Sequence, residues 1–62
     1  MKATVKLPAH LYTELLMRMQ QNFFAVPADY TVTVNNTECQ VTVYSARCYE
    51  FITFYYGSRI IR

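Results

Sequence analysis

The sequence predicts a small α+β fold, in which one helix packs on one face of a small antiparallel sheet, in the order β-α-β-β-β. One segment near the start has apolar residues at helical spacing, and the segments around it alternate apolar and polar side chains as half-buried strands do. The length of 62 residues allows one domain, expected to span 1–62. With 16% aromatic residues and a net charge of +2, the chain is not of the disordered class.

The first two elements follow from the period of the apolar residues. A half-buried strand is expected over Ala3–Leu7, and Pro8 ends it and suits the first turn of a helix. A helix is expected from Ala9 to about Gln21, and Glu14 and Arg18 form an i,i+4 ion pair on its polar face. The apolar stripe of this helix consists of Leu11, Tyr12, Leu15, Leu16 and Met19.

A β-hairpin is expected in the middle of the chain. Apolar residues alternate with polar ones over Tyr30–Asn35 and again over Cys39–Tyr44, and Asn36-Thr37 supplies turn chemistry between them. The sheet then separates Cys39 from Cys48 by more than disulfide geometry allows. Two free thiols fit a reducing compartment, so a cytoplasmic location is expected.

The last segment has two possible structures. The run from Tyr49 to Tyr56 is rich in strand-favouring residues, which favours a fourth strand that Arg59–Arg62 extends after a kink at Gly57. The alternative is a helix over 46–56, with Ser45 as its N-cap and Gly57 as its C-cap. The strand is the preferred prediction because β propensity runs through the whole segment.

The aromatic residues give the candidate binding site. If the last segment is a strand, one face of the sheet stays uncovered and gathers Thr31, Thr33, Gln40, Thr42, Tyr44, Tyr49, Phe51 and Tyr55. Arg47 and Arg59 would lie at the rim of this platform. The predicted partner-binding residues are therefore Tyr44, Arg47, Tyr49, Phe51, Tyr55 and Arg59. If the segment is a helix, Phe54 becomes the anchor, on an outer face with Arg47 and Glu50.

We expect a non-catalytic protein-interaction module, of the size typical of adaptors, regulators and inhibitors, including those that phages and mobile elements encode. It would bind a protein partner or a second copy, as a homodimer, through the aromatic sheet face or an edge strand. The alternative is single-stranded nucleic-acid binding, with bases stacked on Tyr or Phe and Arg meeting phosphates. No catalytic constellation, metal-ligand spacing or cofactor motif is present, and no small-molecule ligand is expected. No apolar run reaches the ~18 residues of a membrane span.

Overall fold

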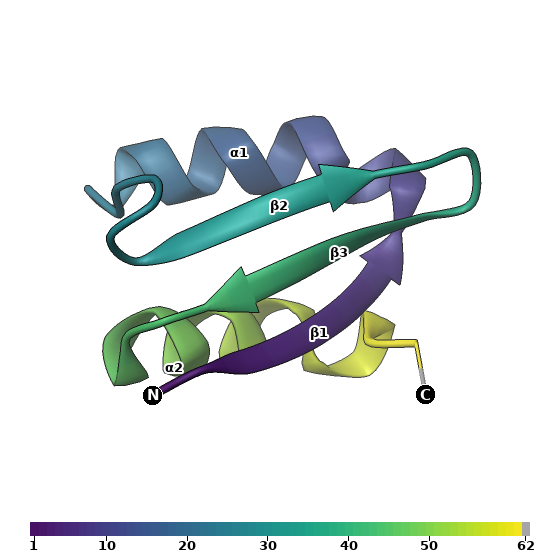
Figure 1. Ribbon diagram of the computed structural model, residues 1–62. Coiled ribbons are helices and arrows are strands. Elements are labelled where there is room, and N and C mark those ends of the chain that lie inside the picture. Colours follow the sequence, from purple (N-terminus) through teal and green to yellow (C-terminus); the bar gives the residue numbers. More distant parts are fainter. Residues whose placement is uncertain (62) are drawn as a thin grey trace.

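The computed structural model describes residues 1–61 as a three-stranded antiparallel sheet with two helices behind it (Figure 1). The small α+β class is therefore confirmed. The strands are β1 (Ala3–Pro8), β2 (Tyr30–Val34) and β3 (Glu38–Val43), in the sheet order β1-β3-β2. The helices are α1 (Tyr12–Gln21), which follows a 3₁₀ turn at Ala9–Leu11, and α2 (Ala46–Tyr56), which precedes a 3₁₀ turn at Gly57–Arg59.

The predicted hairpin is confirmed as β2 and β3, which pair antiparallel with Val32 opposite Val41. Its turn depends on Asn35, one residue earlier than the expected turn pair. The Asn35 side-chain oxygen accepts hydrogen bonds from the backbone N–H groups of Thr37 and Glu38, both at 2.9 Å. An asparagine that bonds its own following backbone in this way fixes a tight turn.

The preferred prediction for the last segment is wrong, because residues 46–56 form helix α2 and not a fourth strand. Ser45 acts as the N-cap, and its Oγ accepts a hydrogen bond from the backbone N–H of Cys48 at 3.2 Å. Cys48, Ile52 and Tyr56 recur every four residues and are all buried. The helical period therefore decides the structure, against the β propensity of the individual residues.

The end of the chain also differs from the strand prediction. Beyond the turn at Gly57–Arg59, Ile61 lies beside β1, and its backbone N–H donates to the carbonyl oxygen of Lys6 at 2.8 Å. Ile60 is half-buried and packs against the core. The predicted extension over 59–62 is thus one contact along β1 rather than a continuation of a strand, and its last residue, 62, lies outside the described residues.

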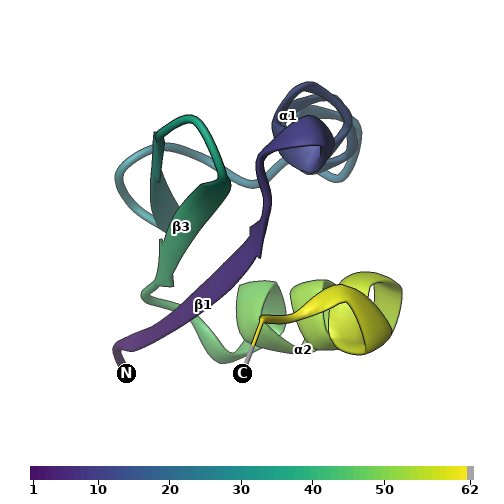
Figure 2. The same cartoon turned by 90° about the vertical axis from the view of Figure 1, so that its right-hand side faces the viewer.

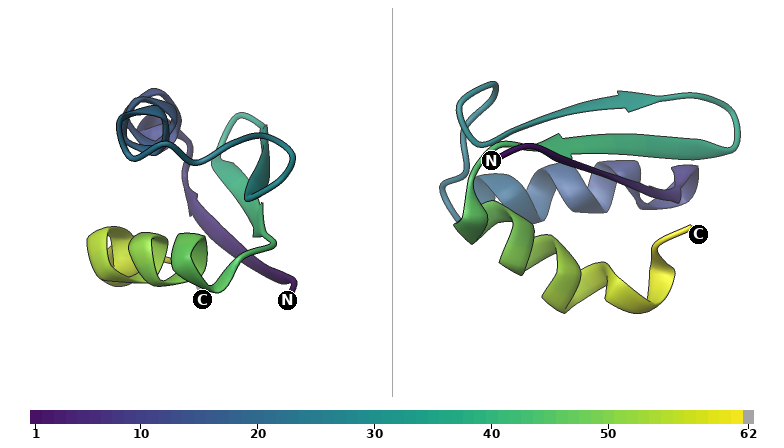
Figure 3. Two further views of the ribbon diagram at one scale, coloured as in Figure 1. Left: turned by 90° about the vertical axis from the view of Figure 1, so that its left-hand side faces the viewer. Right: turned by 60° about the horizontal axis from the view of Figure 1, so that its bottom comes forward.

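Both helices cover the same face of the sheet, and the two views in Figures 2 and 3 show that no described element covers the other face. A helix is about 10 Å wide, and three strands at roughly 4.8 Å spacing form a broader, twisted surface, so one helix leaves part of it bare. The second helix fills that part. The core between the layers consists of Val5, Leu7, Leu11, Leu15, Met19, Phe24, Tyr30, Cys39, Val41, Val43, Cys48, Ile52 and Tyr56.

The uncovered face, called here the open sheet face, is polar. It carries Thr4, Lys6, Thr31, Thr33, Gln40 and Thr42, the residues that alternate with the buried ones. Hydroxyl groups of Thr4 and Thr42, on neighbouring strands, lie 3.3 Å apart within hydrogen-bond distance. An antiparallel sheet with one polar face is stable against water. Within residues 1–61, neither helix is long and apolar enough to cross a membrane.

Candidate binding surface

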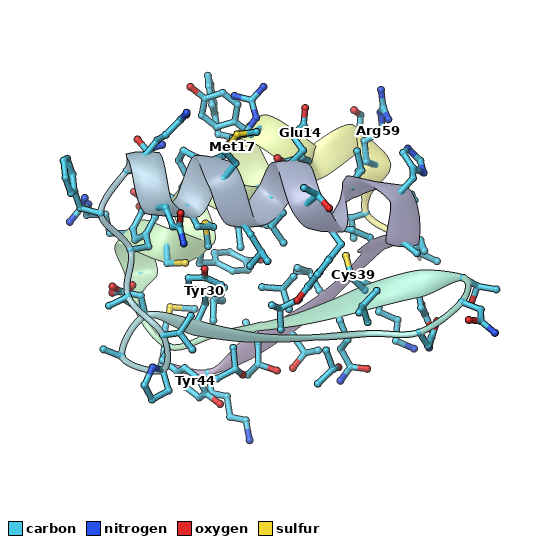
Figure 4. The ribbon with its side chains drawn as sticks, turned by 90° about the horizontal axis from the view of Figure 1, so that it is seen from above. Glu14, Met17, Tyr30, Cys39, Tyr44 and Arg59 are labelled. Carbon is cyan, nitrogen blue, oxygen red and sulfur yellow. The ribbon has the colours of Figure 1, made fainter. Side chains whose placement is uncertain are left out.

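The predicted aromatic platform on the sheet does not form. Because 46–56 is a helix, Tyr49, Phe51 and Tyr55 leave the sheet and join the helical layer. Tyr44 follows β3 directly, and Figure 4 shows it on the side of the sheet opposite Glu14, Met17 and Arg59. The open sheet face therefore keeps its threonines and Tyr44 but loses the other three rings on which the prediction depended.

The rings gather instead in a continuous stack along α2, called here the aromatic ladder: Phe24, Phe51, Tyr55 and Phe54. Phe24 lies in the loop after α1, and its ring centroid is 5.3 Å from that of Phe51. Tyr55 follows at 4.7 Å from Phe51, and Phe54 meets Tyr55 edge-on at 5.2 Å. Tilted and edge-to-face pairs at these separations are the favourable geometries for aromatic rings.

Exposure rises along the ladder from one end to the other. Phe24 is buried, Phe51 is half-buried, Tyr55 is 50% exposed and Phe54 is 81% exposed. Thus the inner rings belong to the core, whereas the outer two present apolar surface to the solvent. An exposed ring held by an ordered neighbour loses little conformational freedom on binding, which favours its use as an anchor.

Two arginines lie on the ladder. The Arg18 guanidinium stacks over the Tyr55 ring at 5.2 Å, and that of Arg47 stacks over Phe24 at 4.9 Å. Arg47 also donates a hydrogen bond to the backbone carbonyl of Asn22 at 3.2 Å, which joins the end of α1 to the start of α2. These cation–π contacts fix the rings and add positive charge beside them.

A shallow pocket of about 290 Å³ lies between α1 and the end of α2. Its lining residues are Leu11, Glu14, Arg18, Tyr55, Tyr56, Ser58 and Arg59. The Tyr56 hydroxyl donates to a Glu14 carboxylate oxygen at 3.2 Å, and Arg18 lies 3.7 Å from the other oxygen. Burial, followed by the nearby Glu14 carboxylate, raises the pKa of Tyr56. The Glu14 carboxylate thus has two partners within the chain, Tyr56 and Arg18. Arg59 makes no side-chain hydrogen bond or ion pair with any of the described residues.

Phe23, which precedes the buried end of the aromatic ladder in the chain, has an unusual backbone conformation. Helix α1 ends in a Schellman motif, in which the N–H of Phe24 bonds to the carbonyl of Met19 at 3.0 Å and that of Phe23 bonds to Gln20 at 3.1 Å. This motif requires a left-handed residue, and Phe23 has φ 63°. A bulky residue rarely adopts this conformation, which glycine accepts easily. The Phe23 ring is 89% exposed.

Of the six predicted site residues, the structure brings four to the helical surface. Phe51 and Tyr55 are in the ladder, Arg47 stacks on it, and Arg59 lines the pocket beside it. Tyr44 lies apart beside the sheet, and Tyr49, although on α2, makes no ring stack among the described residues. Phe54, the anchor expected for the helical alternative, is on the outer face of α2 and strongly exposed.

Sequence reasoning missed Phe23, Phe24 and Arg18 as parts of this surface. The helical spacing places Arg18 on the polar face of the first helix, and its expected ion pair with Glu14 forms. Its contact with Tyr55 depends on where α2 lies. For Phe23 and Phe24, the signal in the sequence is that two phenylalanines stand side by side in a connecting segment.

The two cysteines are free and fully buried. Burial, with Asp29 as a smaller cause, raises the pKa of Cys48 to about 11. A nucleophilic cysteine needs the opposite shift, since the thiolate is the reactive form. No group of three His, Cys, Asp or Glu side chains within the described part of the chain is placed to hold a metal ion.

Comparison with protein-family models, curated proteins and solved structures gives no match to this chain.

Proposed function

We propose that this chain is a non-catalytic protein-binding module, and that its outer surface of Phe54, Tyr55, Arg18 and Arg59 receives an apolar segment of a partner protein flanked by acidic side chains. The observation that carries the proposal is the 81% exposure of Phe54 at the end of an ordered aromatic stack. Aromatic residues and arginine are enriched at protein interfaces and among the residues that dominate their binding energy.

The charges beside the rings support an acidic partner segment. Arg18 and Arg59 both line the pocket that adjoins Tyr55, and the one carboxylate there, Glu14, is engaged by Tyr56 and Arg18. Acidic side chains of a partner would meet unopposed positive charge at Arg59. Complementary charge of this kind sets orientation and speeds association.

Site-specific photo-cross-linking in the native cells tests the proposal. A photoreactive phenylalanine analogue at Phe54 is expected to give one discrete protein adduct, and a second change, Arg59→Glu, should reduce its yield. The same analogue at Gln40, which is exposed on the open sheet face in the central strand β3, is the matched control. Equal labelling from both positions would refute the proposal.

The same experiment distinguishes the alternative of single-stranded nucleic-acid binding. Stacking rings with arginines nearby are also used by such proteins. If the Phe54 adduct is removed by nuclease, and a fluorescent oligothymidine binds with strong salt dependence, the partner is a nucleic acid and the protein-binding proposal is wrong.

A further inference from the structure

The two edges of the sheet differ in how they are protected. The order β1-β3-β2 leaves β1 and β2 each with one side that no strand covers. The β1 edge carries a charged residue, Lys6, and ends in Pro8, which has no backbone N–H to offer. In addition, the backbone N–H of Ile61 already donates to the carbonyl of Lys6. Lysine, proline and a covering segment are the usual means by which natural sheets prevent edge pairing.

β2 has none of these features. Its sequence, Tyr-Thr-Val-Thr-Val, has no charge, proline or glycine, and every residue favours a strand. In the right-hand view of Figure 3, no described helix or strand runs alongside the outer edge of β2. This edge therefore offers backbone groups that another strand can pair with.

The hydrogen bonds between β2 and β3 show which backbone groups of β2 face away from the sheet. Tyr44 donates to the Asp29 carbonyl at 2.8 Å, and Asn35 donates to the Glu38 carbonyl at 2.9 Å. In an antiparallel pair the bonded residues alternate, so Thr31 and Thr33 also bond to β3. The N–H and C=O groups of Tyr30, Val32 and Val34 consequently point away from the sheet.

These outward groups match a second copy of the same strand. If two β2 strands pair antiparallel with Val32 opposite Val32, then Tyr30 of each copy lies opposite Val34 of the other. All three outward residues then exchange backbone hydrogen bonds, about six in total. Between them, Thr31 lies opposite Thr33 of the second copy on the open sheet face, a favourable pair. No like charges oppose each other within this register.

The side chains gain from the same register. Val34 is 48% exposed and Val32 is half-buried, both on the side of the sheet that the helices cover. Tyr30 of the second copy would lie against Val34 and remove part of its surface from water. Burial of apolar surface on the helical side is thus added to the backbone pairing.

We propose that β2 is a homodimerisation edge, at which two copies join their sheets into one six-stranded antiparallel sheet about the Val32 pair. The twofold axis is perpendicular to the sheet, so both helical layers lie on the same side. The dimer would present two copies of the surface around Phe54 in the same direction. This inference uses the sheet edge and is independent of what binds at Phe54.

Light scattering with size exclusion gives the first test. The protein should have twice the mass of its 7.3 kDa chain, and Val34→Lys should weaken the dimer about tenfold or more, because a lysine on the edge opposes pairing. Val26→Lys is the matched control, since Val26 is 60% exposed in the loop before β2 and should leave the dimer intact. A monomeric parent protein, or a dimer insensitive to Val34→Lys, would overturn the proposal.

Cross-linking tests the register itself. A mixture of the Thr31→Cys and Thr33→Cys variants should form an intermolecular disulfide on mild oxidation, because a directly opposed non-hydrogen-bonded pair brings the Cα atoms within disulfide range. Each variant alone should react much less, since Thr31 of one copy does not oppose Thr31 of the other. Equal yields from the mixture and from the single variants would contradict the register. A dimer that Phe54→Ser abolishes, but Val34→Lys does not, would place the second copy on the helical surface instead.

Discussion

The backbone of Phe23 is the single residue at which the local conformation and the residue type disagree most. Its left-handed conformation costs a non-glycine residue about 1–2 kcal/mol, and glycine in turn loses about 0.5–1 kcal/mol of unfolded-state freedom. Because the ring is 89% exposed, its removal sacrifices little burial. We therefore expect Phe23→Gly to raise the free energy of unfolding by about 0.5–1 kcal/mol, as measured by urea denaturation.

The neighbouring Phe24 provides the control for this change. It occupies the following position in the same motif, but its ring is buried against Phe51. Phe24→Gly should therefore lower stability by roughly 3 kcal/mol or more. If Phe23→Gly also proved destabilising, the Phe23 ring would be part of the folded structure and not an exposed ring free to contact a partner.

From the raised pKa of the Cys48 thiol we predict how the free energy of unfolding depends on pH in the alkaline range. Burial raises its pKa from 9.0 to about 11, so the unfolded chain loses this proton at a lower pH than the native chain. The stabilisation is fully present below pH 9 and is lost as the pH rises towards 11, by at most about 1.4 kcal/mol per pH unit. Urea denaturation between pH 9 and 10 should show this decline, and Cys48→Ala should make the curve flatter there. An unchanged slope in the variant would assign the dependence to other groups.

Among the helices and strands, α2 depends most on one local interaction, the N-cap that Ser45 provides. Its run of Tyr, Phe, Ile and Thr favours a strand, and Ser45 supplies the cap that starts the helix. Ser45→Ala should lower the free energy of unfolding by about 1 kcal/mol, because the Cys48 N–H loses its acceptor. Chemical denaturation followed by circular dichroism measures this loss, with Ser58→Ala, which removes no hydrogen bond found among residues 1–61, as the control. A loss of equal size in the Ser58 variant would show that the cap is not the cause.

Elements with one dominant period were predicted directly from the sequence, whereas α2 was predicted only as the alternative to a strand, with its bounds and its Ser45 cap correct. The hairpin alternates over both strands, and the first helix has one clear stripe, so local pattern and tertiary packing agree. In α2, Phe51, Phe54 and Tyr55 are apolar residues outside the buried stripe of Cys48, Ile52 and Tyr56. Those additional rings obscured the helical period and strengthened the strand prediction.

The same rings explain how far the candidate site could be predicted. Phe51, Tyr55, Arg47 and Arg59 were identified because aromatic residues and arginines are conspicuous in a small chain, whatever structure they adopt. Their neighbours Phe24 and Arg18 come from other parts of the chain, and only the packing of α1 against α2 brings them together. Tertiary neighbours of this kind leave no pattern in the local sequence.

The whole molecule is a two-layer structure with a polar sheet face and an unprotected strand edge, and its size limits its stability. At roughly 0.05–0.15 kcal/mol per residue, a chain of 62 residues has only about 3–9 kcal/mol. Small domains commonly gain stability by associating. A strand edge that pairs with itself would provide such a gain without occupying the helical surface.

Association through β2 makes the melting temperature depend on concentration. Unfolding then also separates two chains, so each tenfold increase in concentration adds about 1.4 kcal/mol per dimer, or a rise in Tm of about 3–5 °C for a domain of this size. Scanning calorimetry over a hundredfold range of concentration should show this shift in the parent protein and in Val26→Lys. In Val34→Lys the rise in Tm should begin only at a concentration about tenfold higher or more, because below it the monomer unfolds alone. A constant Tm in the parent protein would mean that the β2 edge remains unpaired and that the helical layer and core alone hold the fold.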